Sequence, residues 1–184
     1  MSWRIGSYVL LLVSATGACQ PPSRSPANGH LEATWEGKEP GRISGVATAG
    51  WCALRSVLEI QTVRGDTGIA LALYPGKGLT PGAYRVLDPV KAESLPPAAG
   101  VAVRWLSKSV IQGFQGESGR VDLERSPSGL LSGRVRAHAR SVVDTQRIVL
   151  TGAFRDVAVH PDSLGCAPAV PPDEDAAAAD TGVH

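Results

Sequence analysis

Apolar and polar side chains alternate along most of the region between residues 31 and 166, which is the pattern of strands that bury one face. In the first such segment Leu31, Ala33 and Trp35 alternate with polar residues, and residues 42–49 continue the alternation more weakly. Gly and Pro interrupt it at the short intervals that are typical of sandwiches and barrels. We find no amphipathic helix in this region. The pattern therefore predicts an all-β domain.

A hairpin and two further strands are expected in the middle of the chain. Leu58 and Ile60 alternate with polar neighbours, and turn-forming residues at 65–68 separate them from the apolar run at 69–74, so these segments are predicted to form a hairpin. Strands are also predicted at 84–87 and 101–106, on either side of a proline-rich crossing.

The clearest alternation lies in the last third of the domain and predicts a three-stranded meander. Val121 and Leu123 belong to its first strand, and Pro127-Ser128-Gly129 predicts a three-residue loop with the glycine in the left-handed conformation. The inward positions of the next two strands are Leu131, Gly133, Val135, Ala137 and Ala139, followed by Ile148, Leu150, Gly152 and Phe154. The two glycines predict bends or a close approach of the sheet.

These elements predict one all-β domain at residues 31–166, an antiparallel sandwich or flattened barrel of about eight to ten strands with little or no helix. Residues 20–29 lack apolar periodicity and are expected to form a flexible tether that reaches at most about 35 Å. Residues 167–184 contain Pro, Ala and acidic residues but few large apolar ones, so we expect them to be disordered.

The first eighteen residues have the order of an export signal. A lone Arg4 precedes an apolar run at 9–13, and small residues follow at 14–18. The apolar centre is about ten residues long, whereas a permanent membrane helix needs about twenty. Residues 1–18 are therefore predicted to be a signal peptide that is removed from the mature protein.

The end of this segment, Thr16-Gly17-Ala18-Cys19, resembles the lipobox of bacterial lipoproteins. The resemblance implies cleavage before Cys19, diacylation of its thiol, and a lipid anchor that holds residues 19–30 and the domain at a cell-envelope membrane. Thr16 departs from the family pattern, which prefers Leu or another aliphatic residue. The alternative is a soluble secreted or periplasmic protein, because Thr16 and Ala18 also suit the general signal peptidase.

The number of cysteines agrees with a lipidated Cys19. An exported chain with three cysteines has one left over, and lipid on Cys19 leaves the pair Cys52 and Cys166. A disulfide between them would close a loop of about 110 residues, worth about 4 to 5 kcal/mol in the chain-entropy model. The alternative is two separate buried thiols. Neither cysteine has a second Cys or His at metal-ligand spacing, so no metal site is expected.

A basic stripe is the main charge pattern of the domain. The net charge of the chain is +1, which together with few aromatics argues against a nucleic-acid binder. However, the alternation that buries one face of residues 131–139 places Arg134, Arg136, His138 and Arg140 on the other. This stripe is a candidate contact for anionic lipid headgroups, envelope polysaccharide or an acidic protein partner. The alternative is an ordinary solvated face, since the loop register places Asp122 opposite Arg134.

Catalytic motifs are weak in this sequence. Asp66-Thr67-Gly68 matches the letters of the aspartic protease motif, but Arg64 and Gly65 before it indicate an exposed turn. The histidines are dispersed, and no serine lies in a Gly-x-Ser-x-Gly elbow. We therefore expect a non-catalytic binding or structural module without a cofactor. A carrier of a small apolar ligand, with a pocket lined by Trp51, Trp105 and Phe114, is the alternative, and a hydrolase whose site is assembled in space is the third.

Overall fold

A computed structural model describes residues 29–161 and Cys166. The predicted signal peptide, the lipidation site at Cys19, most of the tether and the C-terminal tail lie outside the described residues.

The domain is one continuous sheet of eleven strands with a single short helix among the described residues, which confirms the predicted all-β class. The strand order is β11-β3-β4-β5-β7-β6-β8-β9-β10-β1-β2. The elements are β1 (His30–Glu36), β2 (Gly41–Val46), β3 (Thr48–Cys52), β4 (Val57–Arg64), β5 (Thr67–Tyr74), β6 (Gly82–Val86), α1 (Pro89–Ser94), β7 (Ala98–Ser107), β8 (Val110–Arg125), β9 (Leu131–Ser141), β10 (Arg147–Val157) and β11 (Val159–Pro161).

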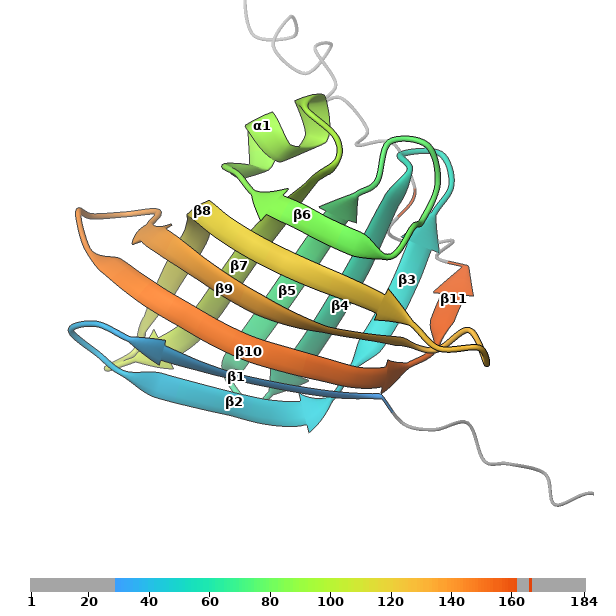
Figure 1. Ribbon diagram of the computed structural model, residues 1–184. Coiled ribbons are helices and arrows are strands. Elements are labelled where there is room, and N and C mark those ends of the chain that lie inside the picture. The colour runs from blue at the N-terminus through green and yellow to red at the C-terminus, as the bar shows by residue number, and fades with distance from the viewer. Residues whose placement is uncertain (1–28, 162–165, 167–184) are drawn as a thin grey trace, which may run out of the picture.

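The sheet curls so that two walls face each other across the core (Figure 1). Strands β6, β8, β9, β10, β1 and β2 form the near wall in this view, and β7, β5, β4 and β3 form the far wall. The apolar side chains between the walls pack into one continuous cluster. The molecule is therefore a flattened half-barrel made from one sheet and not a sandwich of two separate sheets.

The weak strand expected at residues 42–49 is in fact two strands. β2 pairs with β1 in the near wall, whereas β3 pairs with β4 in the far wall. Ala47 separates them, and its N–H donates to the carbonyl of Gly29 at 2.7 Å. A single extended segment thus passes from one wall to the other and joins them at this corner, as strands that switch sheets do in other β folds.

The predicted meander of β8, β9 and β10 is confirmed, and Asp122 lies opposite Arg134 as the loop register indicated. Gly129 has a φ of 84°, although the loop between Arg125 and Leu131 is longer than the three residues expected. β8 also begins well before the predicted segment. Glycines interrupt the alternation in its first half, and its register with β9 shifts between Gly116 and Ser118.

The large aromatic side chains belong to the core. Trp105 stacks between Trp35 and Phe114, with ring centroids 4.9 and 5.0 Å apart. The indole N–H groups of Trp35 and Trp105 donate to the backbone carbonyl and the carboxylate of Glu39, in the loop that follows β1. The three rings therefore close one end of the interior, and Trp51 packs against the same cluster.

A disulfide joins Cys52 to Cys166, as predicted, with their Cα atoms 5.2 Å apart. Cys52 lies in a small second core with Tyr74 and with Ala92 of α1. The helix is capped by the carboxylate of Asp88, which accepts from the N–H of Val90, and it begins with Pro89. Local capping signals mark this helix in the sequence, but it is too short to show a helical period.

Candidate functional site: the arginine row and the seam pocket

The four residues of the basic stripe alternate along β9 and are exposed on the outer side of the near wall. Arg134, Arg136, His138 and Arg140 face solvent, while the residues between them face the core. The structure therefore places the stripe on one face, but its members have different surroundings.

Arg140 is held by two acidic residues. Its guanidinium lies 3.2 Å from the carboxylate of Asp88 and 3.3 Å from that of Glu117, which also contacts Arg147 at 3.3 Å. This network offsets the charge of Arg140 and joins β9 to neighbouring elements. Arg140 therefore contributes less than its neighbours to the positive potential of the outer face.

Arg134 and Arg136 form no salt bridge with any carboxylate of the described residues. Asp122 lies opposite Arg134, but its carboxylate is paired with Arg120 of its own strand. His138 lies between Ser118 of β8 and Val149 of β10. The unpaired charge of the stripe is thus concentrated at Arg134 and Arg136.

Arg136 belongs to a row of polar side chains that crosses six strands of the near wall. Arg85 of β6 pairs with Arg120 of β8, which in turn pairs with Arg136 of β9. Successive pairings continue the row through β10 and β1 to β2. We call this set the arginine row, and its exposed members in spatial order are Arg85, Arg120, Arg136, Thr151, Thr34 and Arg42.

Three arginines directly opposite one another are unfavourable for the fold. Like charges at opposed positions on neighbouring strands are destabilising. Among Arg85, Arg120 and Arg136, Arg120 alone has a carboxylate partner among the described residues, Asp122. The stability of the sheet therefore does not explain this arrangement.

The arginine row ends where the edge strand β2 approaches β4. No backbone pairing between these two strands occurs among the described residues. Instead, side chains of β4 donate hydrogen bonds to backbone carbonyls of β2. The buried hydroxyl of Thr62 donates to Val46 at 2.8 Å, and the guanidinium of Arg64 donates to Ser44 at 3.3 Å. We call this line of contact the seam.

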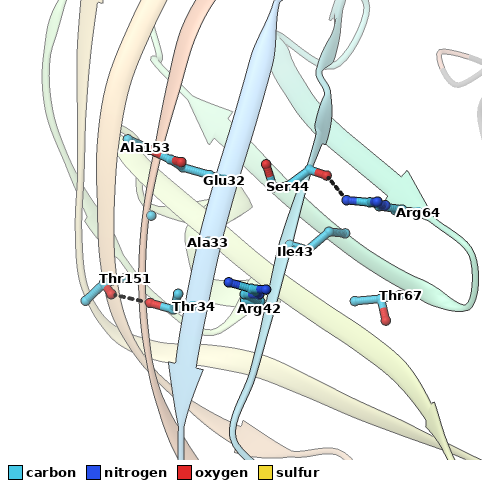
Figure 2. A pocket seen from close by; sticks show the side chains of 11 residues that line it. Glu32, Ala33, Thr34, Arg42, Ile43, Ser44, Arg64, Thr67, Thr151 and Ala153 are labelled. Carbon is cyan, nitrogen blue, oxygen red and sulfur yellow. Dashed lines mark hydrogen bonds between the residues drawn. The ribbon is translucent and has the colours of Figure 1, made fainter.

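A surface pocket of about 820 Å³ lies at the seam, over the end of the arginine row. Figure 2 shows Thr151 and Ala153 of β10 on one side, Arg64 and Thr67 of the β4–β5 hairpin on the other, and β1 and β2 between them. The residues that line this seam pocket are Glu32, Ala33, Thr34, Arg42, Ile43, Ser44, Arg64, Thr67, Thr151, Gly152 and Ala153.

The donors in the seam pocket suit an oxyanion. Arg42 and Arg64 form no salt bridge within the described part of the chain, and the hydroxyls of Thr34 and Thr151 are 3.1 Å apart. Glu32 is the one acidic residue of the lining, and Arg155 binds it at 3.1 Å. Guanidinium and hydroxyl groups together bind carboxylate, phosphate and sulfate.

Ser44, which lines the seam pocket, also contacts a histidine that does not line it. The Nε2 of His30 lies 2.9 Å from the hydroxyl of Ser44. No carboxylate within the described ranges hydrogen-bonds the other ring nitrogen of His30, and both residues lie on a sheet surface. An activated serine needs a base that a third group orients, and this pair lacks the third group.

Local alternation placed β9 correctly but did not show the arginine row or the seam pocket. The row depends on pairings between strands that are not consecutive in the chain, β6 with β8 and β1 with β10. The sequence indicated which alternate residues of each strand face solvent, but it did not indicate the order of the strands in the sheet.

The described residues contain no group of three or more His, Cys, Asp or Glu side chains placed to hold a metal ion. The one helix within these residues, α1, lacks the length and hydropathy required to cross a membrane. Comparisons of the chain with protein-family models, curated proteins and solved structures gave no match.

Proposed function

We propose that the chain is a lipid-anchored protein of a bacterial cell envelope, and that its barrel is a non-catalytic module that binds anionic envelope material through the arginine row. The observation that carries the proposal is the direct opposition of Arg85, Arg120 and Arg136 on the outer face. Because the net charge of the chain is only +1, such binding would depend on this local arrangement and not on the overall charge.

Lipid anchoring is supported by the disulfide. With Cys52 bonded to Cys166, Cys19 is left as the remaining cysteine of the chain, at the position where the lipobox pattern requires the acceptor thiol. The test compares wild type with Cys19→Ser by membrane fractionation and by the mass of the mature N-terminus. Wild type is expected in the membrane fraction with the added mass of its acyl chains. If both proteins are soluble with the same processed end, the anchor is wrong.

The packing of the interior favours surface binding over the carriage of an apolar ligand. The stacked rings of Trp35, Trp105 and Phe114 fill one end of the barrel, and the remaining inward residues join the same cluster. A carrier needs a concave apolar site. A hydrolase receives little support, since Ser44 and His30 lack an orienting carboxylate within the described region.

The binding test compares two double variants with equal net charge. Arg120→Gln/Arg136→Gln removes two members of the arginine row, whereas Arg55→Gln/Arg104→Gln removes two exposed arginines from β7 and the β3–β4 turn. Wild type and the control are expected to bind immobilised polygalacturonate alike, and the row variant is expected to elute at lower salt. Equal elution of both variants would contradict the proposal.

A further inference from the structure

We infer that the seam pocket is one end of an extended binding track and takes a carboxylate or phosphate group of an anionic chain whose other charged groups lie along the arginine row. This inference rests on the proposed function and adds to it the class of ligand, a linear polyanion, and the direction in which that ligand crosses the barrel.

The charge balance of the seam pocket favours an anion. Arg42 and Arg64 come from different walls of the barrel and face one pocket, and neither forms a salt bridge within the described part of the chain. Glu32 offsets them little because Arg155 already binds its carboxylate. One guanidinium N–H of Arg64 is used by Ser44, which leaves its other donors available.

The spacing of the charges favours a chain over a small ion. Three strand-to-strand steps separate Arg136 from Arg42, or about 14 Å at the usual spacing of neighbouring strands. Thr151 and Thr34 occupy the two positions between them. A single carboxylate or phosphate could contact both arginines only if both side chains lay flat along the sheet and pointed toward each other. A chain with charged groups joined by neutral, hydroxyl-rich units matches the order of side chains.

The threonine pair fits such a neutral unit. The Thr34 and Thr151 hydroxyls are hydrogen-bonded to each other, so one of the two O–H groups remains free to donate outward. Both side chains line the seam pocket, whose volume of about 820 Å³ lies within the usual range for small-ligand sites. A ligand that lies along this surface would therefore meet polar side chains at each step from Arg136 to Arg64.

The test measures dissociation constants of the full chain for probes of two lengths and two chemistries. The carboxylate probes are galacturonate and its linear octamer, and the phosphate probes are inorganic phosphate and linear polyphosphate. The seam variant is Arg42→Gln, and Arg55→Gln is the control with the same charge loss. Thermal unfolding of each variant verifies that the fold is intact.

The octamer or polyphosphate is expected to bind wild type at least about tenfold more tightly than the matching single unit, because linked groups occupy linked sites. Arg42→Gln is expected to weaken binding of the long probe about fivefold or more, and Arg55→Gln to leave it unchanged. The chemistry of the tighter long probe identifies the charged group as carboxylate or phosphate.

Four results would overturn the inference. If Arg42→Gln binds the long probes like wild type while Arg120→Gln/Arg136→Gln does not, the seam pocket is not part of the track, although the proposed function stands. If neither Arg42→Gln nor Arg120→Gln/Arg136→Gln loses affinity, both the inference and the proposed function fail. If single units bind as tightly as long probes, the pocket is a small-anion site. Phosphatidylglycerol vesicles bound through Arg42, with no competition from the soluble chains, would identify a membrane surface instead.

Discussion

Arg136 on β9 lies directly opposite Arg120 on β8, with both side chains exposed on the outer face of the barrel. Arg85 lies opposite Arg120 from the other side, so that Arg120 is flanked by like charge. Its own partner is Asp122, two residues along the same strand. The like charges should lower the stability of the sheet, and under the proposed function the same charges bind the ligand. Both effects can be measured in one variant.

Removing the charge of Arg136 is expected to stabilise the fold while weakening the binding of polyanions. Arg136→Thr should raise the free energy of unfolding by about 0.2 to 1 kcal/mol, because it removes a like-charge pair and introduces a residue that favours strands. Arg134→Thr is the matched control on the same strand, and a smaller gain is expected from it, because it introduces the same residue but relieves no like-charge pair: Arg134 faces Asp122. Urea unfolding measures both. A loss of stability in Arg136→Thr would mean that the row supports the sheet.

Gly133 is expected to tolerate no side chain. A Cβ atom there would collide with the carbonyl oxygen of Asp122 and with the ring of Phe154, which packs over this position from β10. Gly133→Ala should therefore lower the free energy of unfolding by about 1 to 3 kcal/mol. Gly100→Ala is the control, since the nearest atom to its added Cβ is 3.9 Å away. Equal unfolding midpoints for the two variants would contradict the close packing of β8, β9 and β10.

The disulfide is expected to be a major contribution to stability. Cys52 and Cys166 are 114 residues apart, and closing a loop of this size contributes up to about 4 to 5 kcal/mol through the entropy of the unfolded chain. The double variant Cys52→Ser/Cys166→Ser should unfold at much lower urea than wild type. Wild type treated with a reductant should match the variant. An unchanged midpoint in both would show that the bridge adds nothing.

The loop between β9 and β10 is expected to respond to acid through Asp144. Its carboxylate accepts from the backbone N–H of Gln146 at 2.8 Å and from the side-chain amide at 2.7 Å. The backbone hydrogen bond, followed by one with Ser141, lowers the pKa of Asp144 below its usual value.

The lowered pKa of Asp144 makes the loop less stable in acid. The folded loop favours the ionised form of Asp144. The contribution of Asp144 to the stability of the loop is therefore complete above the ordinary aspartate pKa of about 3.9, and it is lost as the pH falls through the lower pKa of the folded state. An NMR titration of the Gln146 amide should show a midpoint below 3.9, and Asp144→Asn should abolish that step. A midpoint at or above the ordinary value would contradict these hydrogen bonds.

Much of the fold could be predicted from local patterns. Strict alternation at Leu131 to Ala139 identified β9, and the turn at Gly129 fixed its register with β8, because both signals are short-range. The switch of partners at Ala47 was missed, since a strand that changes walls keeps the same alternation. The arginine row was missed for a related reason. Arg85 and Arg42 join it only through strand order, which long-range packing decides.

Retention of the β domain by cell envelopes can be measured without the lipid anchor. Full-length Cys19→Ser, which lacks the acceptor thiol, is incubated with isolated cell envelopes at about 0.15 M salt, beside the same protein carrying Arg120→Gln and Arg136→Gln. We expect Cys19→Ser to be retained by the envelopes and the variant without the two arginines to be washed away, while Arg55→Gln/Arg104→Gln in the same background is retained. Equal loss of all three proteins, or equal retention, would contradict this expectation.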